Sequence, residues 1–104
     1  MKIDIIPEPL EFEWDKGNQE KNLKKHGVIN EEAEQVFSNE PLVSKDRAHS
    51  TIKEKRYQCL GLTDNKRKLF ISFTIREDKV RIISAQPMSQ KEKKRYVKET
   101  KTNS

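Results

Sequence analysis

The stretch from Phe70 to Ala85 constrains the fold most, because apolar and polar residues alternate through it and arginines recur at the same spacing. Alternation with a period of two is typical of strands with one buried face. We expect two antiparallel strands that turn at Asp78 and Lys79.

The predicted register of this hairpin places Glu77 opposite Val80, Ile75 opposite Ile82, and Phe73 opposite Ser84. Cross-strand partners share a face. One face is then an apolar core of Ile71, Phe73, Ile75, Val80 and Ile82. The other face carries Ser72, Thr74, Arg76 and Arg81, continued by Ile83 and Ala85. Such a sheet can bind an anion on its arginine side, although a slip of one residue would mix the two sets.

Other strands flank this hairpin. Residues 10–14 alternate as a first strand, residues 42–43 begin a short edge strand that leads into a loop, and residues 55–63 form a third main strand. A four-residue loop that pairs Leu62 with Leu69 puts Arg56 on the side of Leu60, toward the core.

Helix signals occur at three places in the sequence. Asp15 suits an N-cap and Gly27 a C-terminal stop, with Leu23 and Val28 turned inward. Asn30 caps a second predicted helix that buries Ala33, Val36 and Phe37 and ends near Ser38 or Asn39. Ser89 and Glu92 form a capping box for a closing helix that runs to about Glu99.

This order of elements predicts an α+β fold, with two helices on one face of a small, mainly antiparallel sheet. At 104 residues, we expect a single domain over residues 1–104, with an extended arm at 1–9 and a frayed tail at 100–104. The N-terminus has no signal-peptide pattern and no apolar run is long enough to cross a bilayer, which predicts a soluble cytoplasmic protein without a membrane partner.

The charge of +5 is unevenly distributed. Residues 1–15 contain five Asp or Glu against one Lys, whereas residues 89–101 contain six Lys or Arg against two Glu. A basic end attracts polyanions or an acidic protein, although a solvated lysine face explains it equally well. Cys59 is expected to be a packed residue, and the two histidines are too far apart for a zinc motif, so no metal or cofactor is expected.

Ordered motifs from Phe12 to Tyr96 resemble one known family. The motifs are FEWD, NLKKHGV, EEAEQVF, PLVSKDR, EKRYQCLGLT, KLFISFTIRED, VRIISA and KEKKRY. Together they are similar to the BrnT toxins of bacterial type II toxin–antitoxin modules. The resemblance implies a RelE-like fold and a metal-independent ribonuclease. It also implies an adjacent BrnA-like antitoxin that neutralises the toxin and represses the operon by binding operator DNA.

The sequence departs from the family pattern at one position. The last strand of the family commonly ends in Ser-Ala-Arg, and Gln86 replaces that arginine here. If the arginine contacts the scissile phosphate, this chain is an altered nuclease. The second hypothesis is therefore a non-catalytic toxin-fold module that acts through antitoxin binding and operon regulation. A plain nucleic-acid binder is a third.

Metal-free RNA cleavage needs cations that stabilise the phosphorane and a group that moves protons. Arg76 and Arg81 are the first candidates for the cation and Arg56 is the third; ordinary salt bridging is the alternative for all three. His26 is the candidate for proton transfer, since imidazole has a pKa of about 6.5, but a helix-end role fits it at least as well. His49 is expected to be incidental.

Candidate RNA-binding residues come from the first helix, the open sheet face and the closing helix. These residues are Lys24, Lys25, Ser72, Thr74, Lys91, Lys94, Arg95 and Tyr96. Solvated helix faces explain the lysines equally well, and Tyr96 more often packs against the sheet. Ser84 falls on the apolar parity and is expected to satisfy backbone groups.

Overall fold

The computed structural model describes residues 6–101, with the side chain of Lys101 left out; residues 1–5 of the predicted arm and 102–104 of the predicted tail lie outside the described part. The elements are β1 (Phe12–Trp14), α1 (Lys16–His26), α2 (Asn30–Ser38), β2 (Leu42–Asp46), β3 (Arg56–Leu62), β4 (Lys68–Arg76), β5 (Lys79–Pro87) and α3 (Gln90–Lys101). The closing helix therefore extends two residues past its predicted end at Glu99.

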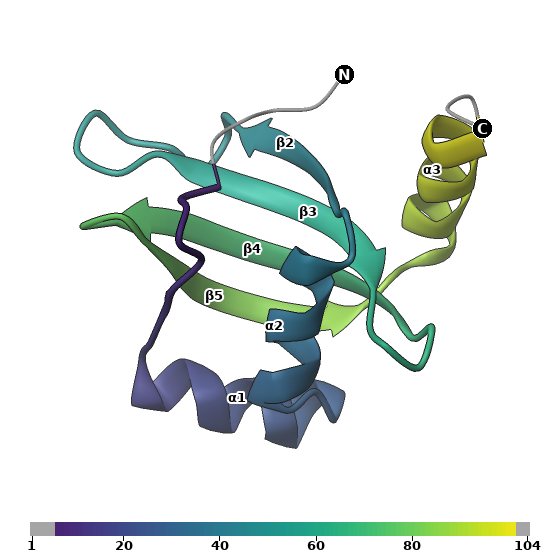
Figure 1. Cartoon of the computed structure of the whole chain (residues 1–104), viewed down its shortest axis with the longest axis horizontal. Coiled ribbons are helices and arrows are strands. Elements are labelled where there is room, and N and C mark those ends of the chain that lie inside the picture. Colours follow the sequence, from purple (N-terminus) through teal and green to yellow (C-terminus); the bar gives the residue numbers. More distant parts are fainter. Residues whose placement is uncertain (1–5, 102–104) are drawn as a thin grey trace.

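The strands form a five-stranded sheet in the order β1-β5-β4-β3-β2. Among the strands of residues 6–101 only the β1–β5 pair is parallel, so the sheet is mainly antiparallel as predicted. Helix α2 lies across one face of the sheet and α1 runs along the edge of β5 (Figure 1), whereas α3 lies beside the end at which β3 finishes. The predicted α+β architecture is confirmed.

The helix ends follow the capping residues of the sequence. The Asp15 carboxylate accepts hydrogen bonds from the backbone N–H groups of Gly17 and Asn18, and Gly27 ends α1 with a left-handed φ of 64°. Ser89 and Glu92 form the predicted capping box of α3. The N-cap of α2 is Ile29 rather than Asn30, because Glu32 reaches back to the Ile29 N–H and supplies the cap.

The core lies between the sheet, helix α2 and the segment that joins α1 to α2. It comprises Val28, Ala33, Val36, Phe37, Cys59, Leu69, Ile71, Phe73, Val80, Ile82 and Ala85. Phe12, Phe37 and Phe73 make edge-to-face contacts with ring centroids 5.5 and 5.0 Å apart. Cys59 packs in this core, and burial raises the pKa of its thiol.

Helix α1 turns Asn22 inward, whereas Leu23 is 54% exposed, so the prediction for Leu23 is wrong. The reason is the short β1, which pairs with β5 only from Val80 to Ile82. Beyond Ile82 the edge of β5 needs another acceptor, and the Asn22 Oδ1 accepts a hydrogen bond of 3.1 Å from the Ala85 N–H.

The hairpin register differs from the prediction by two residues. Arg76 pairs with Lys79, and the turn is Glu77-Asp78, with left-handed φ values of 51° and 62°. A two-residue turn of this kind matches the twist of the strands, but neither residue is the Gly or Asn that would have marked it in the sequence. Ile75 consequently faces Val80, and the apolar face of the hairpin keeps its members.

A bulge between Ser72 and Phe73 also changes the far half of the hairpin, because Ser72 pairs with Ser84 while Phe73 pairs with Ile82. The extra residue reverses the parity of β5 beyond it. Ala85 therefore lies in the core and Ser84 lies on the arginine face, both opposite to the prediction.

The register of β3 against β4 differs from the prediction by one residue. Leu62 pairs with Lys68, not with Leu69, so Arg56 lies directly opposite Thr74. Arg56 is thereby on the arginine face rather than the core side. Leu60 shares that face and is buried where α3 contacts β3.

Candidate functional site

The sheet face turned away from α1 and α2, here called the open face, carries one row of polar side chains across all five strands. Directly paired residues share a face, and the pairing runs Glu13, Arg81, Thr74, Arg56, Asp46. This row lies toward the end of the sheet that contains the β4–β5 turn and the β2–β3 loop (Figure 1). We call it the hairpin end.

Arg81 of this row forms ion pairs with two carboxylates. Its guanidinium donates to Glu13 at 2.9 Å and to Asp15 at 3.2 Å, and its side chain is 24% exposed. The ion pairs fasten β1 and the start of α1 to β5. A phosphate would have to compete with both carboxylates, so the phosphate role of Arg81 stays a prediction.

Arg56 and Arg76 have more free donors for a phosphate than Arg81 has. Arg56 donates through Nε to Glu54 at 2.8 Å, which leaves its terminal nitrogens for another acceptor. Arg76 is exposed, and none of the ion pairs within residues 6–101 includes it. Thr74 is buried, and its hydroxyl donates to the Lys55 carbonyl at 2.7 Å, so in this structure it ties down the loop.

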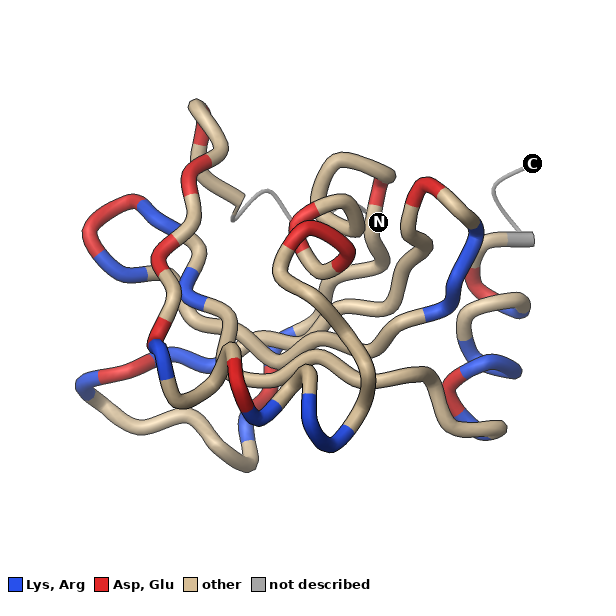
Figure 2. Tube along the Cα trace, turned by 90° about the horizontal axis from the view of Figure 1, so that it is seen from below, with Lys and Arg blue, Asp and Glu red and all other residues tan. Residues whose placement is uncertain are grey.

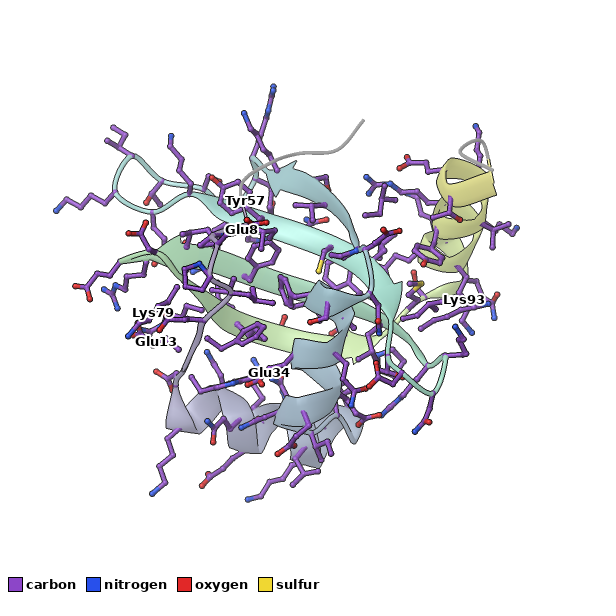
Figure 3. The ribbon with its side chains drawn as sticks, in the orientation of Figure 1. Glu8, Glu13, Glu34, Tyr57, Lys79 and Lys93 are labelled. Carbon is purple, nitrogen blue, oxygen red and sulfur yellow. The ribbon has the colours of Figure 1, made fainter. Side chains whose placement is uncertain are left out.

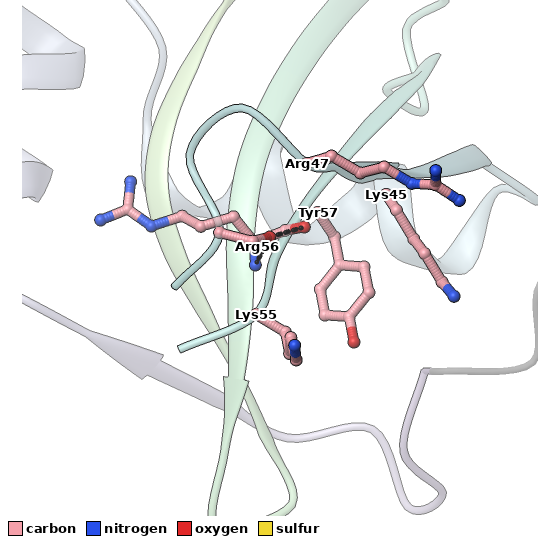
Figure 4. Close-up of a pocket in the computed structure, with 6 residues that line it drawn as sticks. Lys45, Arg47, Lys55, Arg56 and Tyr57 are labelled. Atoms are coloured by element: carbon pink, nitrogen blue, oxygen red, sulfur yellow. Dashed lines mark hydrogen bonds between the residues drawn. The ribbon is translucent and has the colours of Figure 1, made fainter. Parts of the chain in front are cut away.

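A pocket of about 330 Å³ lies beside Arg56 at the hairpin end. Its lining contains four cations and no acidic side chain: Lys45, Arg47, Ser50, Lys55, Arg56 and Tyr57. Figure 4 shows Lys45, Lys55 and Tyr57 extending to one side, while the side chain of Arg56 extends away from them. We call this the basic pocket; its lysines and Arg47 are exposed.

Tyr57 connects the basic pocket with the core. It pairs with Phe73 across the strands, and the two rings stack with centroids 5.7 Å apart. Lys45 is the partner of Tyr57 on the other side. An aromatic ring held in place among cations is an arrangement that binds a nucleotide through base stacking and phosphate attraction.

The Asp46 carboxylate and the His49 imidazole are in contact at the hairpin end. The imidazole Nδ1 lies 2.9 Å from Asp46 Oδ2 and 3.1 Å from Oδ1. Burial by itself would raise the pKa of Asp46, but hydrogen bonds from Gln58 and His49 outweigh it and hold the pKa below its ordinary value. These contacts hold the His49 ring against Asp46.

The predicted residues of α1 lie at the opposite end of the sheet. Arg67, which immediately precedes β4, donates to the carbonyl oxygens of His26 and Gly27 at 3.1 and 2.9 Å. Strand β4 spans nine residues, so this end is roughly 25 Å from Arg76. The structure does not bring His26 and the neighbouring exposed Lys24 and Lys25 together with the arginines.

The predicted residues of α3 also lie away from the hairpin end. Figure 3 shows Glu13 and Lys79 at one end of the molecule and Lys93 of α3 at the other. Lys91 and Lys94 are exposed, and Arg95 donates to Glu99 at 3.3 Å. Tyr96 is half-buried, and this burial raises the pKa of its hydroxyl. Seen from below, Lys and Arg residues gather at both ends of the strands (Figure 2).

Gln86 lies on the open face near the end of β5 that leads to α3. It pairs with Phe70, five residues along β5 from Arg81, and is partly exposed. Ser72 and Ser84 form a pair on the same face between Gln86 and the arginine row. Hydroxyl groups thus lie in the middle of the open face, and an amide lies toward its α3 end.

Neither a metal-ligand cluster nor a membrane helix is found in the described part of the chain. Within residues 6–101, no three His, Cys, Asp or Glu side chains gather closely enough to hold a metal ion. No helix in the same residues is long and apolar enough to cross a membrane.

Sequence reasoning missed most of the basic pocket and the Asp46–His49 pair. Residues 45–56 contain five Lys or Arg against two acidic residues, which is a signal that could have found the pocket. The contacts of His49 had no such signal, because they depend on how the β2–β3 loop folds back.

Comparisons with known proteins agree with this architecture. The crystal structure of the Brucella abortus ribonuclease toxin BrnT superposes with a TM-score of 0.59 at 20% identity, covering 78% of this chain and 99% of the other. Comparison with curated proteins gave no match. Residues 14–92 match the family described as "Ribonuclease toxin, BrnT, of type II toxin-antitoxin system". The chain therefore belongs to the BrnT family of ribonuclease toxins of type II toxin–antitoxin systems.

Proposed function

We propose that this toxin cleaves RNA at the hairpin end of the sheet, where the basic pocket meets the open face. The observation that carries the proposal is the basic pocket, since four cations and one aromatic ring line it and no acidic side chain does. Cations attract the phosphate backbone, and the exposed side of Tyr57 offers a stacking surface for a base.

Cleavage uses the RNA's own 2′-hydroxyl as the nucleophile. Its oxygen attacks the adjacent phosphorus, the bond to the 5′-oxygen breaks, and the products are a 2′,3′-cyclic phosphate and a 5′-hydroxyl. The phosphorane carries extra negative charge, which arginine stabilises with planar donors. Arg56 and Arg76 supply these donors, because Arg81 is held by Glu13 and Asp15.

The wider RNA contact extends from the hairpin end along the open face toward α3. Ser72 and Gln86 offer hydrogen bonds on the way, and α3 offers Lys91, Lys94 and Arg95. A BrnA-like antitoxin silences the toxin by covering the hairpin end, and the complex represses its operon through the DNA-binding part of the antitoxin.

RNA cleavage by the purified protein in EDTA tests this function. Three double variants remove the same charge from different surfaces: Lys45→Ala with Lys55→Ala in the basic pocket, Lys91→Ala with Lys94→Ala on α3, and Lys24→Ala with Lys25→Ala on α1. The pocket variant should lose the most activity, and the slope of log affinity against log salt should fall by about 0.7 for each lost phosphate contact to single-stranded RNA.

Two outcomes would contradict this proposal. A requirement for a divalent metal would overturn cleavage by the 2′-hydroxyl with protein groups alone. Greater loss of activity in the α3 or α1 variant than in the pocket variant would move the site away from the hairpin end.

The second candidate function is a non-catalytic toxin-fold module, and Gln86 is the observation that favours it. Tight antitoxin binding together with no RNA cleavage and no growth inhibition in the absence of antitoxin would support this module. Gln86→Arg then separates the two: recovery of cleavage in this variant would show that the missing arginine alone silences the chain.

A further inference from the structure

The Asp46–His49 pair joins a nearly buried carboxylate to an exposed imidazole. Asp46 is 6% exposed, whereas the side chain of His49 is 69% exposed. Because the pKa of Asp46 is lowered, its carboxylate is ionised near neutral pH and only accepts hydrogen bonds. Nδ1 of His49 must therefore be the donor, which leaves Nε2 as the free nitrogen that can accept a proton.

The loop that carries His49 is tied to the ends of both strands. The backbone N–H of His49 donates to Asp46 Oδ1 at 3.3 Å. The Ser50 hydroxyl donates to the Asp46 carbonyl at 2.6 Å and accepts from the Arg56 N–H at 2.9 Å. These bonds hold the imidazole in one place relative to β2 and β3.

The pair also lies next to the residues of the proposed phosphate site. Asp46 is the direct cross-strand partner of Arg56, and paired residues in a sheet lie about 5 Å apart. Ser50 and Arg56 line the basic pocket as well. A phosphate held by Arg56 would thus have the His49 imidazole nearby.

We propose that His49 is the general base of RNA cleavage and that Asp46 is its positioning residue. Nε2 takes the proton of the 2′-hydroxyl while the 2′-oxygen forms its bond to phosphorus. The bond to the 5′-oxygen breaks, and that oxygen takes a proton from water. The imidazolium then releases its proton to solvent, so the protein ends the cycle unchanged.

A purely structural role would not need the exposed half of the imidazole. The turn is already closed by the His49 N–H and by Ser50, and neither bond uses the ring. What the ring contact adds is a fixed orientation and a carboxylate that stabilises the imidazolium, which is how a carboxylate assists a catalytic histidine. Asp46 on β2 contacts the ring, Arg56 on β3 is the cross-strand partner of Asp46, and Arg47 lies two residues before His49 in the same loop.

The inference rests on the proposed ribonuclease function and is tested by the pH dependence of single-turnover RNA cleavage. A general base must be neutral, so the wild-type rate should rise with pH through the range in which histidine loses its proton, about pH 5 to 8. His49→Gln should lower the rate by about 10²–10⁴-fold and remove this rise. Exogenous imidazole should restore part of the activity of His49→Ala.

Asp46→Asn should lower the rate less than His49→Gln does and should keep a rise with pH, because the imidazole remains but loses the carboxylate that orients it. His26→Gln is the matched substitution at the other histidine and should keep the pH rise. Circular dichroism confirms that each variant is folded.

Three results would overturn the inference, and they differ from one another. Cleavage by His49→Gln at the wild-type rate with an unchanged pH profile removes His49 from the reaction. Loss of the pH rise in His26→Gln instead assigns the base to the other end of the sheet. A wild-type protein that cleaves no RNA in EDTA at any pH refutes the proposed function itself.

Discussion

Arg81→Ala should destabilise the fold rather than act only on RNA cleavage. The guanidinium bridges Glu13 and Asp15 at 2.9 and 3.2 Å, with side chains that are 35% and 45% exposed. Partly exposed ion pairs contribute about 0.2–1 kcal/mol each, so the two together are worth about 1 kcal/mol. For a chain of this size, such a loss lowers the unfolding temperature by about 4–8 °C.

Thermal unfolding followed by circular dichroism measures this effect, and Arg76→Ala is the matched control. Arg76 is exposed and takes part in none of the ion pairs of residues 6–101, so its removal should leave the unfolding temperature within about 2 °C of wild type while reducing cleavage. The Arg81 effect should shrink in high salt, because salt screens surface ion pairs.

A double-mutant cycle with Glu13→Gln isolates the first of these pairs. The coupling between Arg81→Ala and Glu13→Gln should be about 0.5 kcal/mol. Full stability of Arg81→Ala together with complete loss of cleavage would refute this reasoning. It would instead make Arg81 the phosphate-binding arginine that the sequence suggested.

Three further predictions concern buried contacts. Asn22→Ala leaves the Ala85 N–H without its acceptor, so the free energy of unfolding in urea should fall by about 1–3 kcal/mol; no change would mean that water replaces the amide. Gly61→Ala places a Cβ 2.6 Å from Val36 Cγ1, so the packing of Val36 must change and stability should fall by about 1–3 kcal/mol, whereas unchanged stability would contradict this tight contact. The lowered pKa of Asp46 stabilises the fold above the ordinary aspartate pKa, and this contribution is lost as pH falls through the lowered value. Unfolding measured from pH 5 to pH 2 should therefore show a smaller acid-induced loss in Asp46→Asn than in wild type, and parallel curves would refute it.

The elements themselves were predictable because their signals are local. A period of two in residues 70–85 predicted the hairpin, and Asp15 and Gly27 marked both ends of α1. The capping box at Ser89 correctly started α3. Each of these signals depends on neighbouring residues only, so no knowledge of tertiary packing was needed.

The pairing registers were not predictable, because they depend on turn geometry and on one bulge. The Glu77-Asp78 turn lacks the usual glycine or asparagine, and the unpaired Ile83 carries no mark in the sequence. The apolar face survived a register error of two residues, since a shift by an even number preserves parity. The predicted faces of Ser84, Ala85 and Arg56 were wrong, because the register there differs from the prediction by one residue and an odd shift reverses parity.

The sequence by itself determined that this chain forms a mainly antiparallel sheet with one apolar face and one arginine-bearing face, and its ordered motifs pointed to the BrnT family. Only the tertiary structure decided which arginines are free to bind a phosphate. Arg81 forms ion pairs with Glu13 of β1 and with Asp15, the N-cap of α1. Arg56, by contrast, lines the basic pocket and is the cross-strand partner of Asp46 in the Asp46–His49 pair. Such contacts join residues far apart in the sequence or in a folded-back loop, and local periodicity carries no information about either.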